Sequence, residues 1–370
     1  MVRIKSIFLH IGDAKTGTSY IQNFLDVNRQ SLYKNHHILY PNMVSKDYVT
    51  GRYHNHALWI NELKDNPQTF IKELADITRF TKDRSTQGVL LSNEGWLFNN
   101  QSIELCKYLV SEKWFTNIKI ICYLRRIDHW LESAWKQWGL KEHKDFDEYY
   151  QQPRFHKRFK IILTKLAKWE KFVGRENIIL RPYEKIQLPN GIIDDFLQCL
   201  GIDYQKHQWN RTEDNNLATN LGFNQDVLDI LHHCRPLYSD IHDNRFFQLF
   251  SDSLGDKFQK EPFESYGFLS PAQRVEIIEN NRPFEQEIAQ RYMGRKSEGI
   301  FLEPLPDQST SWQPYEGISL EAALPVLVKL IYENNQKISG LKQQITYLEK
   351  WKMGNNIIHK IKKKLHALFS

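Results

Sequence analysis

Residues 10–19 read His10-Ile-Gly-Asp-Ala-Lys-Thr-Gly-Thr-Ser19 and decide the fold of this 370-residue chain. An apolar run of strand type, Ile7 to Ile11, leads into them, and apolar residues at helical spacing begin at Ile21. Backbone N–H groups at a helix start lack intrahelical partners and carry the positive end of the helix dipole, so they bind anions. The stretch therefore predicts a strand, a tight loop and a helix that together hold a phosphate or sulfate group.

The position of the lysine narrows the choice of nucleotide. Loops that bind ATP or GTP read G-x-x-x-x-G-K-[ST], with the lysine after the second glycine. Here Gly12 and Gly17 keep that spacing, but Thr18 stands in the lysine position and Lys15 precedes Gly17. A triphosphate with magnesium is poorly matched to this arrangement. The position of Lys15 favours a nucleotide whose terminal group carries less charge and is transferred without a metal.

Two elements resemble the sulfotransferases that use 3′-phosphoadenosine-5′-phosphosulfate (PAPS). Lys15–Ser19 resembles their 5′-phosphosulfate loop, K-[ST]-G-T-[ST], and Ile121–Ser133 resembles their 3′-phosphate element of strand, arginine and serine. Arg125 and Ser133 occupy the last two positions, where a guanidinium fork and a hydroxyl can converge on one phosphate. The alternative is that these are ordinary surface residues. The resemblance implies PAPS as co-substrate, released as 3′,5′-adenosine bisphosphate (PAP).

The resemblance also assigns roles to residues of this chain. Lys15 is expected to bridge the leaving phosphate and the transferred group. The 5′-phosphate is expected to be cradled by Thr16, Gly17, Thr18 and Ser19. Tyr20 and Tyr183 are candidates for contact with the adenine, with core packing as the alternative for both.

A hydroxyl acceptor needs a general base within reach of its proton. Glu94 lies after a strand where relatives place a base, although a glutamate at a helix start also interacts favourably with the dipole. His54 and His56 are the rival candidates for base or acceptor binding. Their H-x-H spacing lacks a third ligand, so no metal is expected. Ser92 replaces the family's usual cation near the base, so a second positive charge on the moving group is unassigned.

Candidate strands alternate with helical segments along the chain. This order predicts an α/β fold, a P-loop-type parallel sheet flanked by helices, whose ligands lie at the carboxyl ends of the strands. Lys15, Glu94 and Arg125 all follow such strands. The candidate strands are residues 4–11, 38–40, 88–92, 118–124 and 178–181.

Composition limits the partners and the compartment. The net charge of +6 suits an anionic donor and an acidic glycan or lipid surface, but it is too diffuse to indicate nucleic acid. The four cysteines lack C-x-x-C spacing, which favours a reducing compartment. The apolar stretch at the N-terminus is too short for a signal peptide or a membrane span, so a cytoplasmic enzyme is expected.

The C-terminal part has a different pattern. We predict a sulfotransferase α/β domain over 1–305, a linker over 306–325 and a helical tail over 326–370. Residues 357–369 form a basic amphipathic segment suited to peripheral attachment to anionic lipid at the inner face of the membrane, or a solvated helix. A heptad that predicts a coiled coil, and with it a homo-oligomer, comprises Ile331, Asn334, Ile338, Leu341, Ile345 and Leu348.

These patterns favour sulfuryl transfer from PAPS to a hydroxyl of a carbohydrate, polysaccharide or lipid-linked glycan, by in-line displacement assisted by a base. The sequence also allows two other interpretations. One is a nucleotide-dependent kinase with an atypical P-loop, which would need ATP and magnesium. The other is a membrane-associated scaffold with a degenerate nucleotide site.

Overall fold

The computed structural model describes residues 4–45, 47–53, 56, 66–82, 86–112, 115–210, 223–254, 267–296 and 298–368. The chain divides into two compact units. The first comprises 1–217 and 263–315, and the second comprises 218–262 and 316–370. The candidate site lies entirely in the first unit.

Within the described residues, five strands form one sheet in the order β2-β3-β1-β4-β5, and all neighbouring pairs are parallel. The predicted α/β fold is thereby confirmed. The register places His10 opposite both Ser92 and Ile121, so the loops after β1 and β3 begin at one edge of the sheet. The strands are β1 (Ile4–His10), β2 (Ile38–Leu39), β3 (Gly88–Ser92), β4 (Phe115–Leu124) and β5 (Ile178–Pro182).

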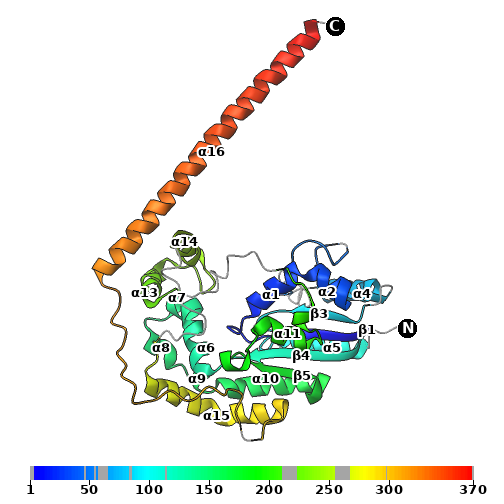
Figure 1. Cartoon of the computed structure of the whole chain (residues 1–370), viewed down its shortest axis with the longest axis vertical. Coiled ribbons are helices and arrows are strands. Elements are labelled where there is room, and N and C mark those ends of the chain that lie inside the picture. Colours follow the sequence, from blue (N-terminus) through cyan, green and yellow to red (C-terminus); the bar gives the residue numbers. More distant parts are fainter. Residues whose placement is uncertain are drawn as a thin grey trace. The chain divides into compact units, whose positions relative to one another are not determined.

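Helices cover the sheet, and Figure 1 shows α10 and α15 side by side. Helices of the first unit are α1 (Thr18–Val27), α2 (Arg29–His36), α4 (Pro67–Lys82), α5 (Asn100–Glu112), α6 (Ile127–Ala134), α7 (Leu140–Glu142), α8 (Phe146–Tyr150), α9 (Pro153–His156), α10 (Arg158–Val173), α11 (Ile192–Cys199) and α15 (Pro271–Met293). Between α6 and α7 lies η1, a π-helix over Trp135–Gly139. Short 3₁₀ turns occur at Arg175–Asn177, Lys185–Gln187 and Tyr204–Lys206.

The apolar spacing after the first loop gives α1 one buried face. Ile21, Phe24 and Leu25 pack into a core cluster that also contains Phe8 of β1 and Phe196 of α11. Burying such side chains stabilises the fold by about 1.5–3 kcal/mol each. This packing fixes the N-terminus of α1 over the carboxyl end of β1, where the predicted anion loop lies.

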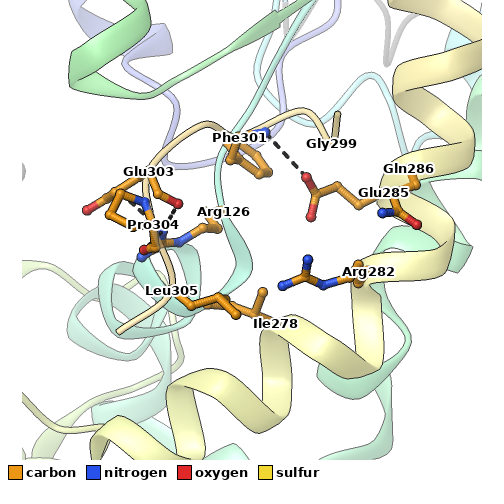
Figure 2. Close-up of a pocket in the computed structure, with 10 residues that line it drawn as sticks. All are labelled: Arg126, Ile278, Arg282, Glu285, Gln286, Gly299, Phe301, Glu303, Pro304 and Leu305. Atoms are coloured by element: carbon orange, nitrogen blue, oxygen red, sulfur yellow. Dashed lines mark hydrogen bonds and ion pairs between the residues drawn. The ribbon is translucent and has the colours of Figure 1, made fainter. Parts of the chain in front are cut away.

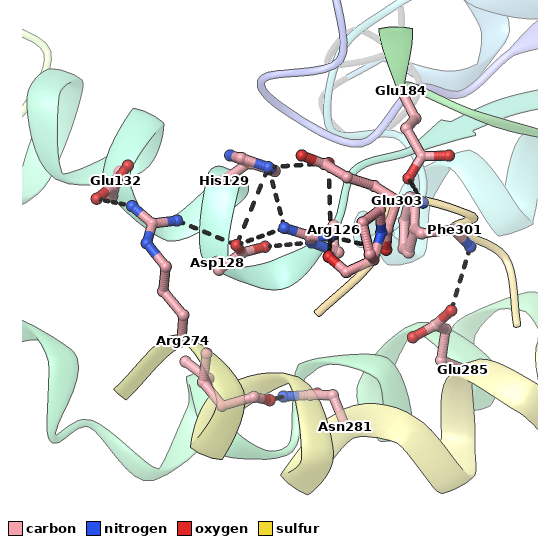
Figure 3. A network of polar contacts seen from close by, with 12 residues as sticks. Arg126, Asp128, His129, Glu132, Glu184, Arg274, Asn281, Glu285, Phe301 and Glu303 are labelled. Atoms are coloured by element: carbon pink, nitrogen blue, oxygen red, sulfur yellow. Dashed lines mark hydrogen bonds and ion pairs between the residues drawn. The ribbon is translucent and has the colours of Figure 1, made fainter. Parts of the chain in front are cut away.

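A buried ion-pair network joins α15 to α6 (Figure 3). Arg126 Nε and Arg274 Nη1 lie 2.8 and 3.0 Å from the two carboxylate oxygens of Asp128, and Arg274 also pairs with Glu132. Burial raises the pKa of Asp128, but His129, Arg126 and Arg274 outweigh it and hold this pKa below its ordinary value. Removing one member of such a network costs about 3–5 kcal/mol, because a buried charge is left unpaired. The network holds α6 in place, and α6 begins directly after Arg125 and Arg126.

The second unit contains α13 (Gln225–His233), the 3₁₀ turn Arg235–Leu237, α14 (Arg245–Ser253) and α16 (Leu320–Leu368). Helix α16 begins inside the stretch predicted as a linker and continues unbroken through the predicted tail. Ala323, Val326 and Leu330 near its start are buried, whereas the heptad positions from Ile338 to Leu348 include exposed isoleucines and leucines. None of the helices described is long and apolar enough to cross a membrane.

Candidate anion-binding site

The loop between β1 and α1 adopts a conformation that requires Gly17. Gly17 has φ 77° and caps α1, and a Cβ atom there would lie 2.9 Å from Ile192 Cδ1 and 3.0 Å from Tyr183 Cε2. Lys15 also lies in the left-handed region, with φ 67°. Alternation into left-handed backbone makes concave groups of N–H donors that bind anions. The loop therefore has the backbone shape that an anion site needs.

Neighbouring side chains hold this loop from several directions. Trp130 Nε1 donates to Ala14 O at 3.0 Å, and Arg125 Nη1 donates to Lys15 O at 3.1 Å. Thr16 Oγ1 donates to Asp13 O at 2.6 Å. Fixed donors stabilise charge better than mobile ones because they need no reorganisation.

Backbone hydrogen bonds hold the segment that contains Glu94 against the same loop. Asn93 N donates to His10 O and Gly95 N donates to Gly12 O, both at 3.1 Å. These bonds attach the segment after β3 to the loop after β1. Burial raises the pKa of Glu94, with Asp13 adding to the effect and Lys15 opposing it. A carboxylate with a raised pKa is better suited to accept a proton from a hydroxyl.

The Lys15 amine lies among cations. It donates to Gln137 Oε1 and lies 5.3 Å from the centre of the Trp138 ring. Its pKa falls to about 7, first through burial and then through Lys136, while Glu94 raises it and Arg125 and Lys141 lower it further. A bound anion would favour the charged amine and raise this pKa again.

Arg125 and Tyr183 complete the same edge of the sheet. The Arg125 guanidinium lies 5.5 Å from the centre of the Tyr183 ring, and Tyr183 N donates to Leu124 O at 2.7 Å. Ser133 is partly exposed on α6, the helix that follows Arg125. Tyr20 packs against the core cluster while remaining partly exposed. The structure thus brings Lys15, Glu94, Arg125 and Tyr183 around the loop, and Ser133 and Tyr20 lie on the two helices beside it.

Of the two candidate histidines, the structure describes His56. His54 lies outside the described residues. His56 is fully buried; its Nε2 donates to Pro41 O at 3.0 Å and its Nδ1 accepts from Ser92 N at 3.1 Å. Burial lowers its pKa to about 4, although the bonds to Pro41 and Ser92 oppose this. With both ring nitrogens bonded to backbone, His56 has less freedom to act as a base than Glu94.

Sequence reasoning missed a polar cluster beneath the loop. Ser92 is fully buried; its Oγ lies 2.8 Å from His10 Nδ1 and accepts from Gln22 Nε2 at 3.1 Å. Burial lowers the pKa of His10 to about 3, so the ring is neutral. Ser92 is thus committed to the support of the loop. The alternation of strand residues at β1 and β3 could have indicated that His10 and Ser92 face the same side.

Sequence reasoning also missed the residues after Ser133. Lys136, Gln137 and Trp138 belong to η1, and Lys141 is buried in α7. The only signal in the sequence was two lysines shortly after the predicted 3′-phosphate element. Their approach to Lys15 depends on a π-helix, which ordinary helical spacing does not predict.

A separate cavity of about 240 Å³ lies between α15 and the segment 299–305 (Figure 2). Arg126 and Glu285 line it, but none of the predicted site residues does. Glu285 accepts from Ile300 N at 2.8 Å and Phe301 N at 3.3 Å, and so holds the segment in place. Among the residues that the structure describes, no group of three or more His, Cys, Asp or Glu side chains is arranged to hold a metal ion.

No protein-family model matches the chain. An uncharacterised protein of Archaeoglobus fulgidus is 34% identical over 138 residues, which are 36% of this chain and 36% of that protein. The chain therefore spans about a third of the length of the curated relative it matches.

Three solved structures are similar at low sequence identity. A sulfotransferase from Alicyclobacillus acidocaldarius is 15% identical with a TM-score of 0.34, over 64% of this chain and 93% of that one. A sulfotransferase domain from the curacin biosynthetic pathway is 10% identical with a TM-score of 0.35, over 78% and 98%. A sulfotransferase domain from the Synechococcus PCC 7002 olefin synthase is 11% identical with a TM-score of 0.30, over 76% and 94%.

Proposed function

We propose that the chain is a PAPS-dependent sulfotransferase that acts on a hydroxyl of a carbohydrate or lipid-linked glycan. The observation that carries the proposal is the convergence of Lys15, Glu94 and Arg125 around one anion loop whose lysine precedes its glycine. A cation, a carboxylate with a raised pKa and a guanidinium are the groups that such a transfer needs.

The donor is held at its two ends. The backbone N–H groups of Thr16, Gly17, Thr18 and Ser19 receive the 5′-phosphate at the start of α1. Arg125 and Ser133 receive the 3′-phosphate, with the guanidinium supplying paired donors and the hydroxyl a third. Tyr183, against Gly17 and beneath Arg125, borders the nucleoside between them, and Tyr20 follows the loop.

The transfer itself needs one proton acceptor and one proton-bearing cation. Glu94 takes the proton of the acceptor hydroxyl while that oxygen bonds to sulfur, and the bond between sulfur and the bridging phosphate oxygen breaks. Charge then develops on the phosphate, where the protonated Lys15 stabilises it. A loose, in-line displacement depends mainly on such positioning and electrostatic stabilisation. The products are the sulfated acceptor and PAP.

We extend the proposal to the tail of the second unit. The side chains of Ile338, Leu341 and Ile345 are 49%, 59% and 55% exposed on α16, which suits a coiled coil with a second copy. The sequence 357–369 is basic and amphipathic, which suits an anionic membrane surface in the cytoplasm. Light scattering should report a dimer or higher oligomer that Leu341→Glu dissociates; a wild-type monomer would overturn this part.

Transfer of labelled sulfate from PAPS to fractionated cell-envelope glycans tests the enzyme class. Wild type should label one fraction, whereas Lys15→Ala should not. Glu94→Gln should lose about 10²–10⁴-fold in rate, the usual contribution of a general base. Dependence on ATP and magnesium instead of PAPS would support a kinase, and no binding of either nucleotide would support a scaffold.

A further inference from the structure

The candidate site carries more positive than negative charge. Lys136, Arg125 and Lys141 all act on the Lys15 amine as neighbouring cations, and Glu94 is the facing carboxylate that opposes them. A second carboxylate, Asp13, is paired with Arg158. Like charges close together are unfavourable, so an arrangement of this kind is stabilised when an anion enters.

Lys136 belongs to the π-helix η1, the same turn that contacts the Lys15 amine. Gln137 accepts the hydrogen bond of the Lys15 amine, and the Trp138 ring lies near the same amine. The two residues that follow Lys136 in the chain thus both lie at Lys15. A π-turn holds one more residue than an α-turn and redirects the side chains that follow. Lys136 is partly exposed, as a residue that meets a ligand must be.

Aromatic packing holds this turn open. Trp135 is buried, and its ring centre lies 5.5 Å from those of Tyr149 and of Phe146. A Cβ atom on Gly139 would clash with the Trp135 ring and lie 3.0 Å from Tyr149. The wide turn that contains Lys136 is therefore held by the packing of the segment.

We propose that Lys136 binds the non-bridging oxygens of the sulfuryl group of the donor, as the second cation of the transfer. The inference rests on the proposed function. Ser92, where the sequence left this charge unassigned, is buried and bonded to His10 and Gln22, so it serves the loop instead. Lys15 neutralises the bridging oxygen that departs, and Lys136 holds the group that moves. Lys141, buried in α7, adds to the positive potential at Lys15.

Comparison of two ligands that differ only in the sulfuryl group tests the assignment. Binding of PAPS and of PAP, without acceptor, is measured by calorimetry for wild type, Lys136→Met and Lys136→Arg. Lys144→Met, at an exposed lysine of the same segment, is the control. We expect Lys136→Met to weaken PAPS about tenfold and PAP less than about twofold, as one lost charge-assisted contact implies. Lys136→Arg should recover most of the loss, and Lys144→Met should match wild type.

A second readout does not depend on donor binding. Removal of the Lys136 charge should raise the pKa of Lys15, which the pH dependence of Lys15 acylation, followed by mass spectrometry, reports in the free protein. A pKa raised all the way to the ordinary value of 10.5 would instead show that the variant has lost the fold around Lys15. An unchanged pH profile of Lys15 would contradict the placement of Lys136.

The remaining outcomes separate the inference from the function it rests on. Equal weakening of PAPS and PAP would assign Lys136 to the nucleotide phosphates and overturn the inference alone. In the labelled-sulfate assay, a change only in the KM of the acceptor would assign Lys136 to the acceptor and overturn the inference alone. If wild type binds neither ligand, the proposed function fails and the inference falls with it.

Discussion

The amine of Lys15 donates a hydrogen bond to the side-chain amide of Gln137. This contact joins the loop after β1 to the π-helix that follows α6, two segments far apart in the chain. It also gives the lysine a neutral partner among cations while no anion is present. Arrival of an anionic donor should exchange this partner for a charged one and restore the full charge of the amine.

Proton uptake on binding follows from this exchange. The pKa of free Lys15 is about 7, and a bound anion raises it, so between pH 7 and the bound pKa the lysine is neutral when free and charged when bound. Binding of PAP at pH 8 should take up nearly one proton, and uptake should decrease below pH 7. Calorimetry in buffers of different ionisation enthalpy measures this number. Unchanged uptake in Lys15→Met would show that another group is responsible.

Arg125→Ala should act on one end of the nucleotide. Its guanidinium is assigned to the 3′-phosphate, so we expect binding of PAP to weaken by about 10–100-fold, in line with a lost charge-assisted pair. Binding of adenosine 5′-monophosphate, which lacks that phosphate, should weaken less, because only the hydrogen bond from Arg125 to Lys15 O is lost. Arg154→Ala, at an exposed arginine, is the control. Equal weakening of both nucleotides would contradict the assignment.

Gly17→Ala should destabilise the fold more than Gly191→Ala does. Both glycines have positive φ, 77° and 87°, and a side chain there costs about 1–2 kcal/mol in backbone strain. Only at Gly17 would the new Cβ also press on Ile192 and Tyr183, while no atom lies within 4 Å at Gly191. Overpacking adds about 1–3 kcal/mol. Urea unfolding measures the difference, and equal losses would show that the loop is not tightly packed.

Acid should weaken the fold through His56. Its pKa is about 4 in the folded protein and 6.5 as the ordinary value, so the unfolded chain binds the proton more readily. Its contribution to stability is complete above pH 6.5 and is lost as the pH falls towards 4, by up to about 3 kcal/mol. The free energy of unfolding of His56→Gln should therefore depend less on pH across this range.

The difference in slope between wild type and His56→Gln is the measured quantity, because other groups titrate too. Burial raises the pKa of Glu94 and of Glu285, so these carboxylates change stability in the opposite direction. They are common to both proteins and cancel. Identical slopes would mean that His56 is accessible to protons in the folded state.

The sequence predicted those features of the fold that depend on residues close together in the chain. Apolar spacing predicted the order of strands and helices and the parallel sheet. The position of Lys15 followed from its place in the loop after the first strand. Gly17 was expected to help cradle the 5′-phosphate, and the structure adds that Ile192 and Tyr183 leave no room for a side chain there.

Long-range packing determines what the sequence did not predict. The π-helix of Lys136 depends on Trp135, Gly139 and Tyr149, and their contact exists only in the folded chain. The burial of His56 and Ser92 likewise depends on how separate loops meet at the end of β3. Residues 218–262 group with the tail, 316–370, for the same reason, since no composition change marks them.

Binding of PAP to the wild-type chain, compared with ATP and magnesium under the same conditions, tests most directly whether one adenosine donor spans the site from Lys15 to Arg125. We predict saturable binding of PAP that both Lys15→Met and Arg125→Ala weaken, with ATP and magnesium binding far less well. Tight binding of ATP that requires magnesium, or binding of PAP that is indifferent to both substitutions, would contradict the account.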